Sequence, residues 1–323
     1  MPVAQVAVHD QRRLMLAFAA LVLCAVAMGA SPIFVRFADV GPYASAFWRT
    51  FLALPFLWAW ARVESGTNPL PTPPPQGGRE RKLSGLWAER QFGLTAPILL
   101  AGVFFAGDLF FWHLSILATT IANATFLATT SPIWVALGAW LVLSERIGVR
   151  MLIGLALCIG GGLALVGESY AVAPERVRGD LYGLATAVFF GAYILAMRAA
   201  RADVSAARLA FLSTAVTAGC LFVIAVLFDT TLMTSSWSGA AALVALALVS
   251  QVGGQGLLSV ALGTLPATFS ALVIFLEAIA AAAFGWIVFG EALGLPQALG
   301  GLLILFGIWT ARPRVEAAAE AVR

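Results

Sequence analysis

Four ionisable side chains lie inside long apolar stretches of the sequence and are the first candidates for chemistry: Arg49, Asp108, His113 and Glu277. An ionisable group inside a membrane is costly, so it usually marks a substrate path or a proton relay. Glu277 is near the middle of its stretch, where a carboxylate could bind a substrate amine or accept a proton. The alternative is a neutral carboxyl group that hydrogen-bonds a neighbouring helix.

Polar and aromatic residues at helical spacing accompany Asp108. Trp112 follows four residues later and shares its helix face, while Phe105, Leu109 and His113 form the adjoining face. The corresponding face, 146 residues later, carries Gln251, Gln255 and Ser259. We predict that these polar groups line a shared cavity, in which amides and hydroxyls bind an amino-acid head group and aromatic rings hold its side chain. Hydrogen bonding between helices is the alternative.

Arg49, His113 and Tyr193 each have two interpretations. Arg49 lies about two turns from the outer end of its stretch, where it could attract a carboxylate, extend toward water or pair with an acid. His113 could relay protons, or it could be a hydrated structural residue near a helix end. Tyr193 could line the cavity, or it could pack between helices.

Membrane-spanning helices must position these side chains. The chain has 323 residues, of which 61% are hydrophobic and 11% charged, whereas soluble proteins carry about 25% charged residues. A span needs about 20 mostly apolar residues, and ten segments qualify. They are residues 14–35, 43–61, 93–117, 120–143, 150–167, 180–199, 206–228, 238–262, 266–289 and 296–311. The sequence therefore predicts an all-α integral membrane protein with ten transmembrane helices.

The charges predict the orientation of these helices. Most of the 19 Lys and Arg residues gather on one side when the N-terminus is placed in the cytoplasm, as the positive-inside rule requires. Residues 1–13 and 312–323 are then cytoplasmic. The Pro- and Gly-rich residues 64–82 predict an extended or disordered cytoplasmic linker. The three cysteines lack the spacing of a disulfide framework or a metal site, so we expect no metal and no cofactor.

The sequence also repeats itself. Like residues recur 146 residues apart: Trp140 and Trp286, Glu145 and Glu291, and Gly154 and Gly300. Near the start of each half, Gly29 and Gly191 are 162 residues apart, and the difference of 16 residues matches the Pro-rich linker. The halves, 14–167 and 168–311, hold five segments each, so they must insert in opposite orientations. Such inverted halves are typical of secondary transporters that work by alternating access.

Several repeated residues have a structural interpretation. Glu145 and Glu291 lie at segment ends, and we interpret them as helix-end anchors. The fifth and tenth segments are rich in glycine, which lets helices approach closely. These glycines are Gly154, Gly160, Gly161, Gly162, Gly300, Gly301 and Gly307. We expect them to pack the two halves together or to form a dimer contact, so that a monomer and a homodimer are both compatible with the sequence.

The chain resembles the EamA-type branch of the drug/metabolite transporter superfamily. The resemblance rests on the run SPIWVALGAWLVLSERI (131–147), its second copy EAIAAAAFGWIVFGEAL (277–293), the corners at 118–124 and 263–268, and Phe47-Trp48-Arg49. Ala278 stands where the family usually has proline. The resemblance implies ten helices in two five-helix repeats, and uptake or export of small polar metabolites, often amino acids, without ATP. No phosphate-binding Gly-x-x-x-x-Gly-Lys loop occurs in the sequence.

We therefore expect a secondary transporter, not an enzyme, that exports neutral or aromatic amino acids across a bacterial inner membrane. Other metabolites or drugs, such as nucleosides and amines, are the alternatives. A membrane enzyme would need clustered catalytic carboxylates or histidines at the membrane surface, and a channel would usually show pore motifs or charged rings. The expected partners are a small-molecule substrate, the lipid bilayer and a proton, with no nucleic acid, because the net charge of +3 is small.

Overall fold

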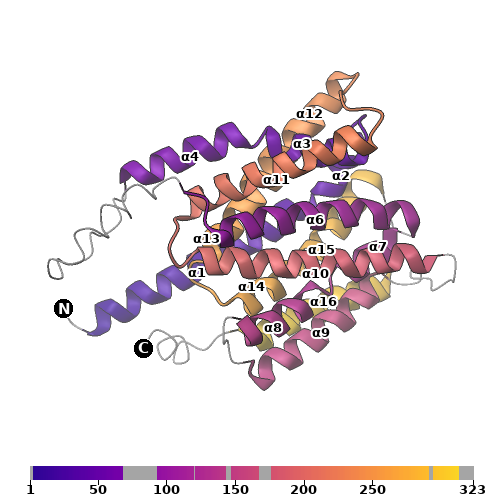
Figure 1. Cartoon of the computed structure of the whole chain (residues 1–323). Helices are drawn as coiled ribbons and strands as arrows, with labels where there is room; N and C mark the ends of the chain where they lie inside the picture. The colour runs from indigo at the N-terminus through magenta and orange to yellow at the C-terminus, as the bar shows by residue number, and fades with distance from the viewer. Residues whose placement is uncertain are drawn as a thin grey trace.

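The computed structural model describes residues 3–67, 93–119, 121–142, 147–166, 176–290 and 294–312. Within these ranges the chain forms helices and no β-strand, and the helices pack side by side in one bundle (Figure 1). The all-α class is therefore confirmed. Glu145, Glu291 and residues 68–82 of the expected linker lie outside the described residues.

The helices of the two halves follow one another along the chain. The first half contains α1 (Val3–Gly29), α2 (Ser31–Phe37), α3 (Pro42–Phe51), α4 (Leu54–Thr67), α6 (Ala96–Ala118), α7 (Ile121–Ala128), α8 (Ser131–Val142) and α9 (Val149–Val166). The second half contains α10 (Val177–Ala200), α11 (Ala206–Phe228), α12 (Trp237–Ala245), a π-helix η4 (Leu246–Gln255), α13 (Gly256–Ala261), α14 (Ala267–Ile274), α15 (Leu276–Phe289) and α16 (Leu295–Ala311).

Many of these helices are long and apolar enough to cross a membrane. Six stretches of the described chain qualify: Gln11–Phe37, Ala96–Ser115, Val177–Ala200, Ala206–Phe228, Trp237–Ala261 and Ala267–Val288. Three shorter helices are also apolar: Phe126–Leu141, Val149–Ala164 and Leu295–Ala311. Each of the ten expected segments contains helix. These observations support a multi-pass membrane protein, whereas the count of ten spans and the cytoplasmic location of the termini stay predictions.

Residues 64–67 differ from the expected extended linker, because α4 continues through them. The carboxylate of Glu64 accepts a hydrogen bond of 2.8 Å from the backbone N–H of Ala207, at the start of α11. The hydroxyl of Ser65 donates to the carbonyl oxygen of Ala61 at 2.8 Å. Both polar side chains therefore have partners that are compatible with a continuing helix.

Two expected spans are interrupted near the repeat-equivalent residues Ser131 and Glu277: one resumes at Ser131 and the other at Leu276, next to Glu277. The first interruption separates α7 from α8, and the second separates α14 from α15 at Phe275. Pro132 accounts for the first, because proline has no N–H for the helical hydrogen bond. Ala278 stands at the equivalent place in the second span, so that interruption forms without proline. Discontinuous helices of this kind often border the substrate site of a transporter.

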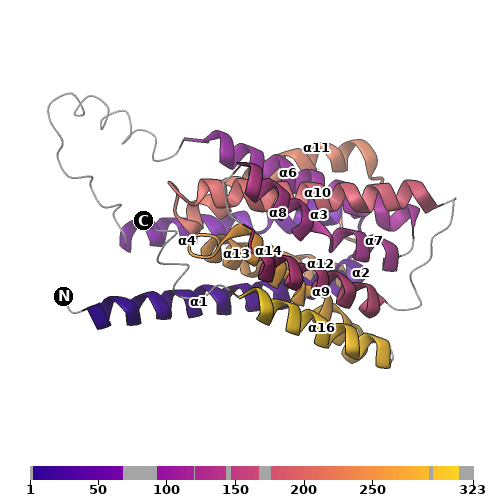
Figure 2. The ribbon, with the colours of Figure 1, turned by 90° about the horizontal axis from the view of Figure 1, so that it is seen from below.

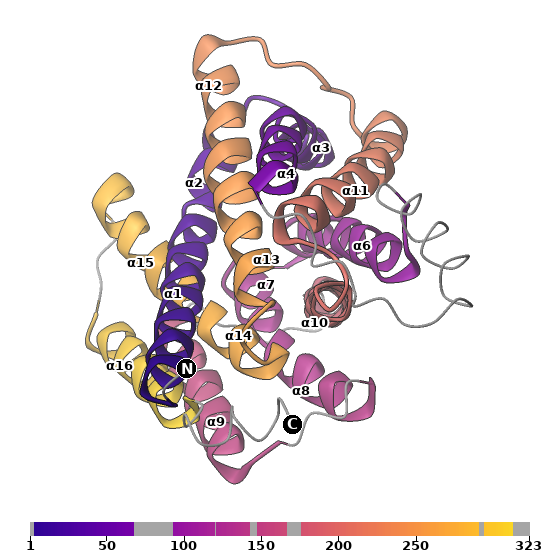
Figure 3. The same ribbon diagram turned by 90° about the vertical axis from the view of Figure 1, so that its left-hand side faces the viewer.

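Helix packing follows the repeat. α1, the first helix of its half, packs against α14 and α15 and against η4 and α13. α10, the first helix of the other half, packs against the equivalent elements, which are α7, α8 and α6. α9 packs against α16, and α11 packs against α3 and α4, so these contacts are kept when the halves are exchanged. Figure 3 shows α14 between α1 and α10.

The direction of the helices agrees with inverted halves. α1 starts at the end of the bundle where the N-terminus is marked, whereas α10 starts at the opposite end, after the grey segment that follows α9 (Figure 1). The same relation is visible from below in Figure 2. The first helices of the two halves therefore run in opposite directions.

Two glycines hold α9 and α16 close together at repeat-equivalent places. A Cβ atom at Gly161 would lie 2.6 Å from the carbonyl oxygen of Gly300, and one at Gly307 would lie 2.7 Å from that of Gly154. Such distances are shorter than any stable contact of a methyl group, so both positions need glycine. Of the two roles expected for these glycines, the structure shows the packing of one half against the other.

Candidate functional site

A cavity of ≈ 150 Å³ lies between the two halves. Its walls come from α1 and α2, from α3, α6 and α10, and from the ends of the interrupted helices α7, α8, α14 and α15. The volume is below the range of about 300–1,000 Å³ that is typical of pockets for drug-sized ligands. The cavity therefore suits a small metabolite.

Three of the four ionisable candidates line this cavity: Arg49 from α3, Asp108 from α6 and Glu277 from α15. Arg49 and Asp108 are buried, at 7% and 8% exposure, and Glu277 is partly buried. Within the described residues, neither carboxylate has a hydrogen-bond or ion-pair partner, although both interact electrostatically with Arg49. Unpaired charges at such burial are costly, so a ligand that carries complementary charges would stabilise these three side chains.

The side chain of Arg49 is held by two neighbours. Its Nε atom donates a hydrogen bond of 3.2 Å to Oε1 of Gln251. The guanidinium carbon lies 5.7 Å from the ring centroid of Phe105, within the range of a cation–π interaction. Phe105 in turn stacks on Tyr193, with ring centroids 4.7 Å apart. These contacts fix the arginine beside the cavity while its terminal nitrogens have no acceptor in the described part of the chain.

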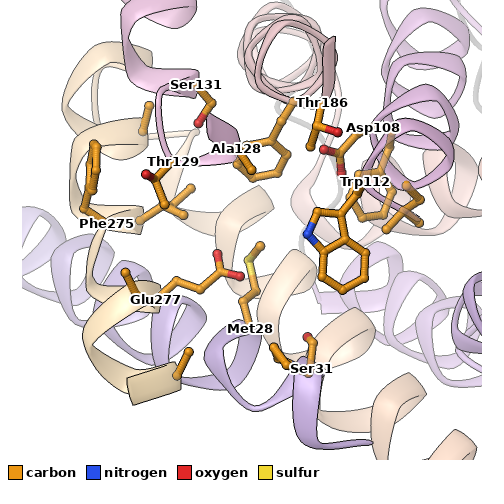
Figure 4. Close-up of a pocket in the computed structure, with 18 of the residues that line it drawn as sticks. Met28, Ser31, Asp108, Trp112, Ala128, Thr129, Ser131, Thr186, Phe275 and Glu277 are labelled. Atoms are coloured by element: carbon orange, nitrogen blue, oxygen red, sulfur yellow. The ribbon is translucent and has the colours of Figure 1, made fainter. Parts of the chain in front are cut away.

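Glu277 reaches the cavity because α14 and α15 are separated just before it. It is in the first turn of α15, where unpaired backbone N–H groups and the helix dipole favour a negative charge. Figure 4 shows its carboxylate pointing into the middle of the cavity, toward the side chain of Met28. Ser131 has the same place at the start of α8 and also lines the cavity.

Asp108 lies on the opposite wall with Trp112, one helical turn further along α6. Figure 4 shows Asp108 on the same side of the cavity view as Trp112 and as Thr186 of α10, which also lines the cavity. Asp108 and Trp112 therefore share one face, as their spacing predicts, and that face lines the cavity. The two carboxylates come from different halves of the chain.

The expected polar face of the eighth span lies behind the cavity lining. Gln251 donates to Oγ1 of Thr214 at 3.0 Å in addition to accepting from Arg49. Gln255 accepts a hydrogen bond of 2.9 Å from the hydroxyl of Tyr193. Ser259 donates to the carbonyl oxygen of Ala206 at 2.8 Å. These side chains, including Tyr193, are buried in hydrogen bonds between helices, and they support the lining instead of forming it.

His113 is also outside the cavity lining. Its Nδ1 atom lies 2.6 Å from the carbonyl oxygen of Leu109, and its Nε2 atom is buried without a hydrogen-bond partner in the described residues. The rings of Tyr43 and Trp112 pack against it, at centroid distances of 5.9 Å and 5.0 Å. Its place is a buried aromatic cluster one helical turn beyond Leu109.

Other lining residues were not among the candidates. Met28 and Phe190 both line the cavity, and they are the residues directly before the repeated Gly29 and Gly191. Thr129, Ser131 and Phe275 line it because they flank the helix interruptions. The repeat alignment contains the signal for these positions, since they recur in pairs. The structure describes no group of three or more His, Cys, Asp or Glu side chains that could hold a metal ion.

Comparisons with known proteins agree with this architecture. The model of the EamA-like transporter family matches residues 15–167 and 177–311. No curated protein matches the chain. One solved crystal structure of a protein has the same fold, with a TM-score of 0.69 and 19% identity, over 93% of this chain and 98% of that chain. The family model spans most of the sequence in two copies, so the chain belongs to the EamA-like transporter family and is a membrane transporter of the drug/metabolite type.

Proposed function

We propose that the protein is a secondary transporter that exports amino acids across a bacterial inner membrane by alternating access, with ten spans and both termini in the cytoplasm. One observation carries the proposal: Arg49, Asp108 and Glu277 face one small cavity between the halves, and neither carboxylate has a hydrogen-bond or ion-pair partner in the described protein. A zwitterionic amino acid offers charges of both signs, which this site requires.

The expected contacts follow from charge. The substrate carboxylate pairs with the guanidinium of Arg49, whose fork of donors suits a carboxylate. The substrate ammonium group pairs with Asp108 or Glu277. A ligand that neutralises these groups offsets the cost of keeping them inside the membrane, and this cost gives the cavity a preference for a charged metabolite over lipid or water.

Aromatic and sulfur-containing side chains supply the rest of the lining. Trp112, Phe190, Phe275 and Met28 surround the charged groups. Aromatic rings bind apolar and aromatic side chains well, and thioethers adapt to irregular shapes. This lining suits the apolar part of a substrate side chain, which neutral and aromatic amino acids have and which a long basic side chain has in its aliphatic portion. The charged groups place a second requirement on the substrate, because its own charges must neutralise them when the cavity closes.

Alternating access is supported by the inverted packing of the halves and by the two interrupted helices that border the cavity. Ser131 is the first residue of α8 and Glu277 the second residue of α15, so a small rotation there changes the position of both side chains relative to the cavity. An exchange of conformations between the halves would open the cavity to each side in turn.

Export of amines is the second candidate function. The site holds two carboxylates against one guanidinium, and an excess of negative charge favours a cation. A simple amine, however, leaves Arg49 without a partner, which is why an amino acid fits better.

Transport can be tested with the purified full-length chain in proteoliposomes. A labelled amino acid should accumulate transiently when the vesicles are loaded with the same unlabelled amino acid, and vesicles without protein are the blank. Asp203→Asn, at an exposed position outside the cavity, is the control for expression and reconstitution. Absence of counterflow for every amino acid in a panel that includes neutral, aromatic, basic and acidic members would overturn the proposal.

A further inference from the structure

The charged groups of the cavity are unequal in number, since one guanidinium faces two carboxylates. Each carboxylate also occurs only once in the repeat. The residue equivalent to Asp108, 146 positions later, is Gly254, and the residue equivalent to Glu277, 146 positions earlier, is Ser131. The two acids are therefore separate features on two walls, Asp108 on α6 and Glu277 on α15, and not one duplicated position.

Neither acid has an ion-pair partner in the described residues. Arg49 uses its Nε atom for Gln251 and one face for Phe105, and it forms no ion pair with either carboxylate in the described residues. A ligand must therefore supply one anionic group for Arg49 and two cationic groups for Asp108 and Glu277 if each charge is to be paired.

We infer that the substrate of this cavity is a basic amino acid, which has one α-carboxylate, one α-ammonium group and one cationic side chain. The inference rests on the proposed amino-acid transport and narrows its substrate class. The α-carboxylate binds Arg49, and the two cationic groups bind Asp108 and Glu277. The aliphatic part of the side chain lies against the apolar lining, where Met28 stands between Glu277 and the wall that carries Asp108 and Trp112 (Figure 4).

Other substrate classes leave a charge unpaired. A neutral amino acid leaves one carboxylate without a cation, and an acidic amino acid adds a third carboxylate. A diamine pairs both acids but leaves Arg49 beside two ammonium groups. A neutral amino acid pairs every charge only if Asp108 or Glu277 is protonated. The experiment must therefore distinguish a substrate with a second cationic group from a neutral substrate that is transported together with a proton.

Counterflow in proteoliposomes tests the substrate class with the wild-type chain. Labelled lysine and labelled leucine are each measured in counterflow at the same pH, with and without a pH gradient. We expect the lysine signal to exceed the leucine signal by about tenfold or more, the effect of one charge-assisted hydrogen bond, and to persist without a pH gradient. Leucine counterflow equal to or above that of lysine would overturn the inference and leave amino-acid transport standing. Absence of lysine counterflow would also overturn the inference, and the wider panel of amino acids then decides whether amino-acid transport itself stands.

Variants provide an independent measurement. Asp108→Asn and Glu277→Gln each remove one negative charge at constant size, so each should lose the preference for lysine over leucine. Asp203→Asn, an exposed acid outside the cavity, should keep it. Unfolding temperatures with and without lysine show which variants remain folded. A folded Glu277→Gln and a folded Asp108→Asn protein that both keep the wild-type preference would contradict the assignment.

Discussion

Gly29 lies directly against Glu277: a Cβ atom at position 29 would come within 2.9 Å of the carbonyl oxygen of Glu277. The equivalent pair in the other half is Gly191 and Ser131, at 3.4 Å. The first helix of each half therefore contacts the other half in the first turn of the second part of an interrupted helix. This contact is made by the backbone of Glu277, so we expect a change in it to alter how α15 presents that residue to the cavity.

This contact predicts opposite effects for two glycine substitutions. Gly29→Ala forces a methyl group against α15 and should destabilise the fold by about 1–3 kcal/mol, as overpacking does. Gly160→Ala, at an exposed place in α9 with no atom within 4 Å of its Cβ, should stabilise by about 0.5–1 kcal/mol, because alanine is the better helix former. Unfolding temperatures in detergent measure both. A Gly29→Ala protein as stable and active as Gly160→Ala would contradict the close packing.

Gln251 is expected to act through Arg49. Its replacement in Gln251→Leu removes the acceptor of a hydrogen bond to a charged group, which is worth about 1.5–3 kcal/mol. The half-saturation concentration for an amino acid should rise about tenfold or more. An amine without a carboxylate does not need Arg49, so its half-saturation concentration should stay the same. Equal losses for both substrates would indicate general damage to the helix.

Two replacements of Arg49 distinguish the effect of its positive charge from the effect of its planar arrangement of hydrogen-bond donors. Lysine keeps the positive charge but lacks the planar fork of donors, so Arg49→Lys should transport lysine with a raised half-saturation concentration. Arg49→Met should lose the advantage of lysine over the corresponding diamine, because the α-carboxylate has no partner. Counterflow of both labelled compounds measures this ratio. A wild-type ratio in Arg49→Met would exclude Arg49 from carboxylate binding.

The sequence predicts much of the site, because ionisable groups are rare inside membrane-spanning segments and usually have a function there. Arg49, Asp108, Trp112 and Glu277 all line the cavity, as expected from their charge, aromatic character and helical spacing. The repeat offset also equates Ser131 with Glu277, and both lie in the first turn of a helix that follows an interruption. These features depend on local sequence and on the internal repeat, and both can be recognised in a single sequence.

The places of Gln251, Gln255 and Tyr193 could not be predicted in the same way. Helical spacing indicates which face a side chain shares, but not whether another side chain stands between it and the cavity. η4 adds a further difficulty, since the wider turns of a π-helix change the face of every residue after it. The interruption at Phe275 could not be predicted either, because no proline follows it in the sequence as Pro132 follows the first interruption.

A loop contact between the halves predicts a pH dependence of stability. Hydrogen bonds from the side chains of Thr234 and Ser235 hold the pKa of Asp39 below its usual value of 3.8. A carboxylate with a lower pKa in the folded state stabilises the fold above its unfolded pKa, and this stabilisation is lost as the pH falls through the folded pKa. Wild type should therefore unfold at a higher temperature than Asp39→Asn at pH 7.

The difference between wild type and Asp39→Asn should be constant down to about pH 4 and shrink only in stronger acid, below the pKa of an unperturbed Asp. Unfolding temperatures in detergent across this range check the prediction, with Asp203→Asn as an exposed control. A difference that disappears between pH 5 and 6, or that is absent at pH 7, would show that Asp39 does not join the loops.

Accessibility of Ser131 tests the central claim most directly, since this residue lines the cavity at the start of α8. Ser131→Cys is made in a chain with Cys220→Ser, because Cys24 and Cys158 are buried. A membrane-impermeant thiol reagent is then applied from each side of the membrane. The account predicts labelling from both sides and slower labelling from both sides in the presence of a transported amino acid. Labelling from one side only, or labelling unaffected by every amino acid, would contradict it.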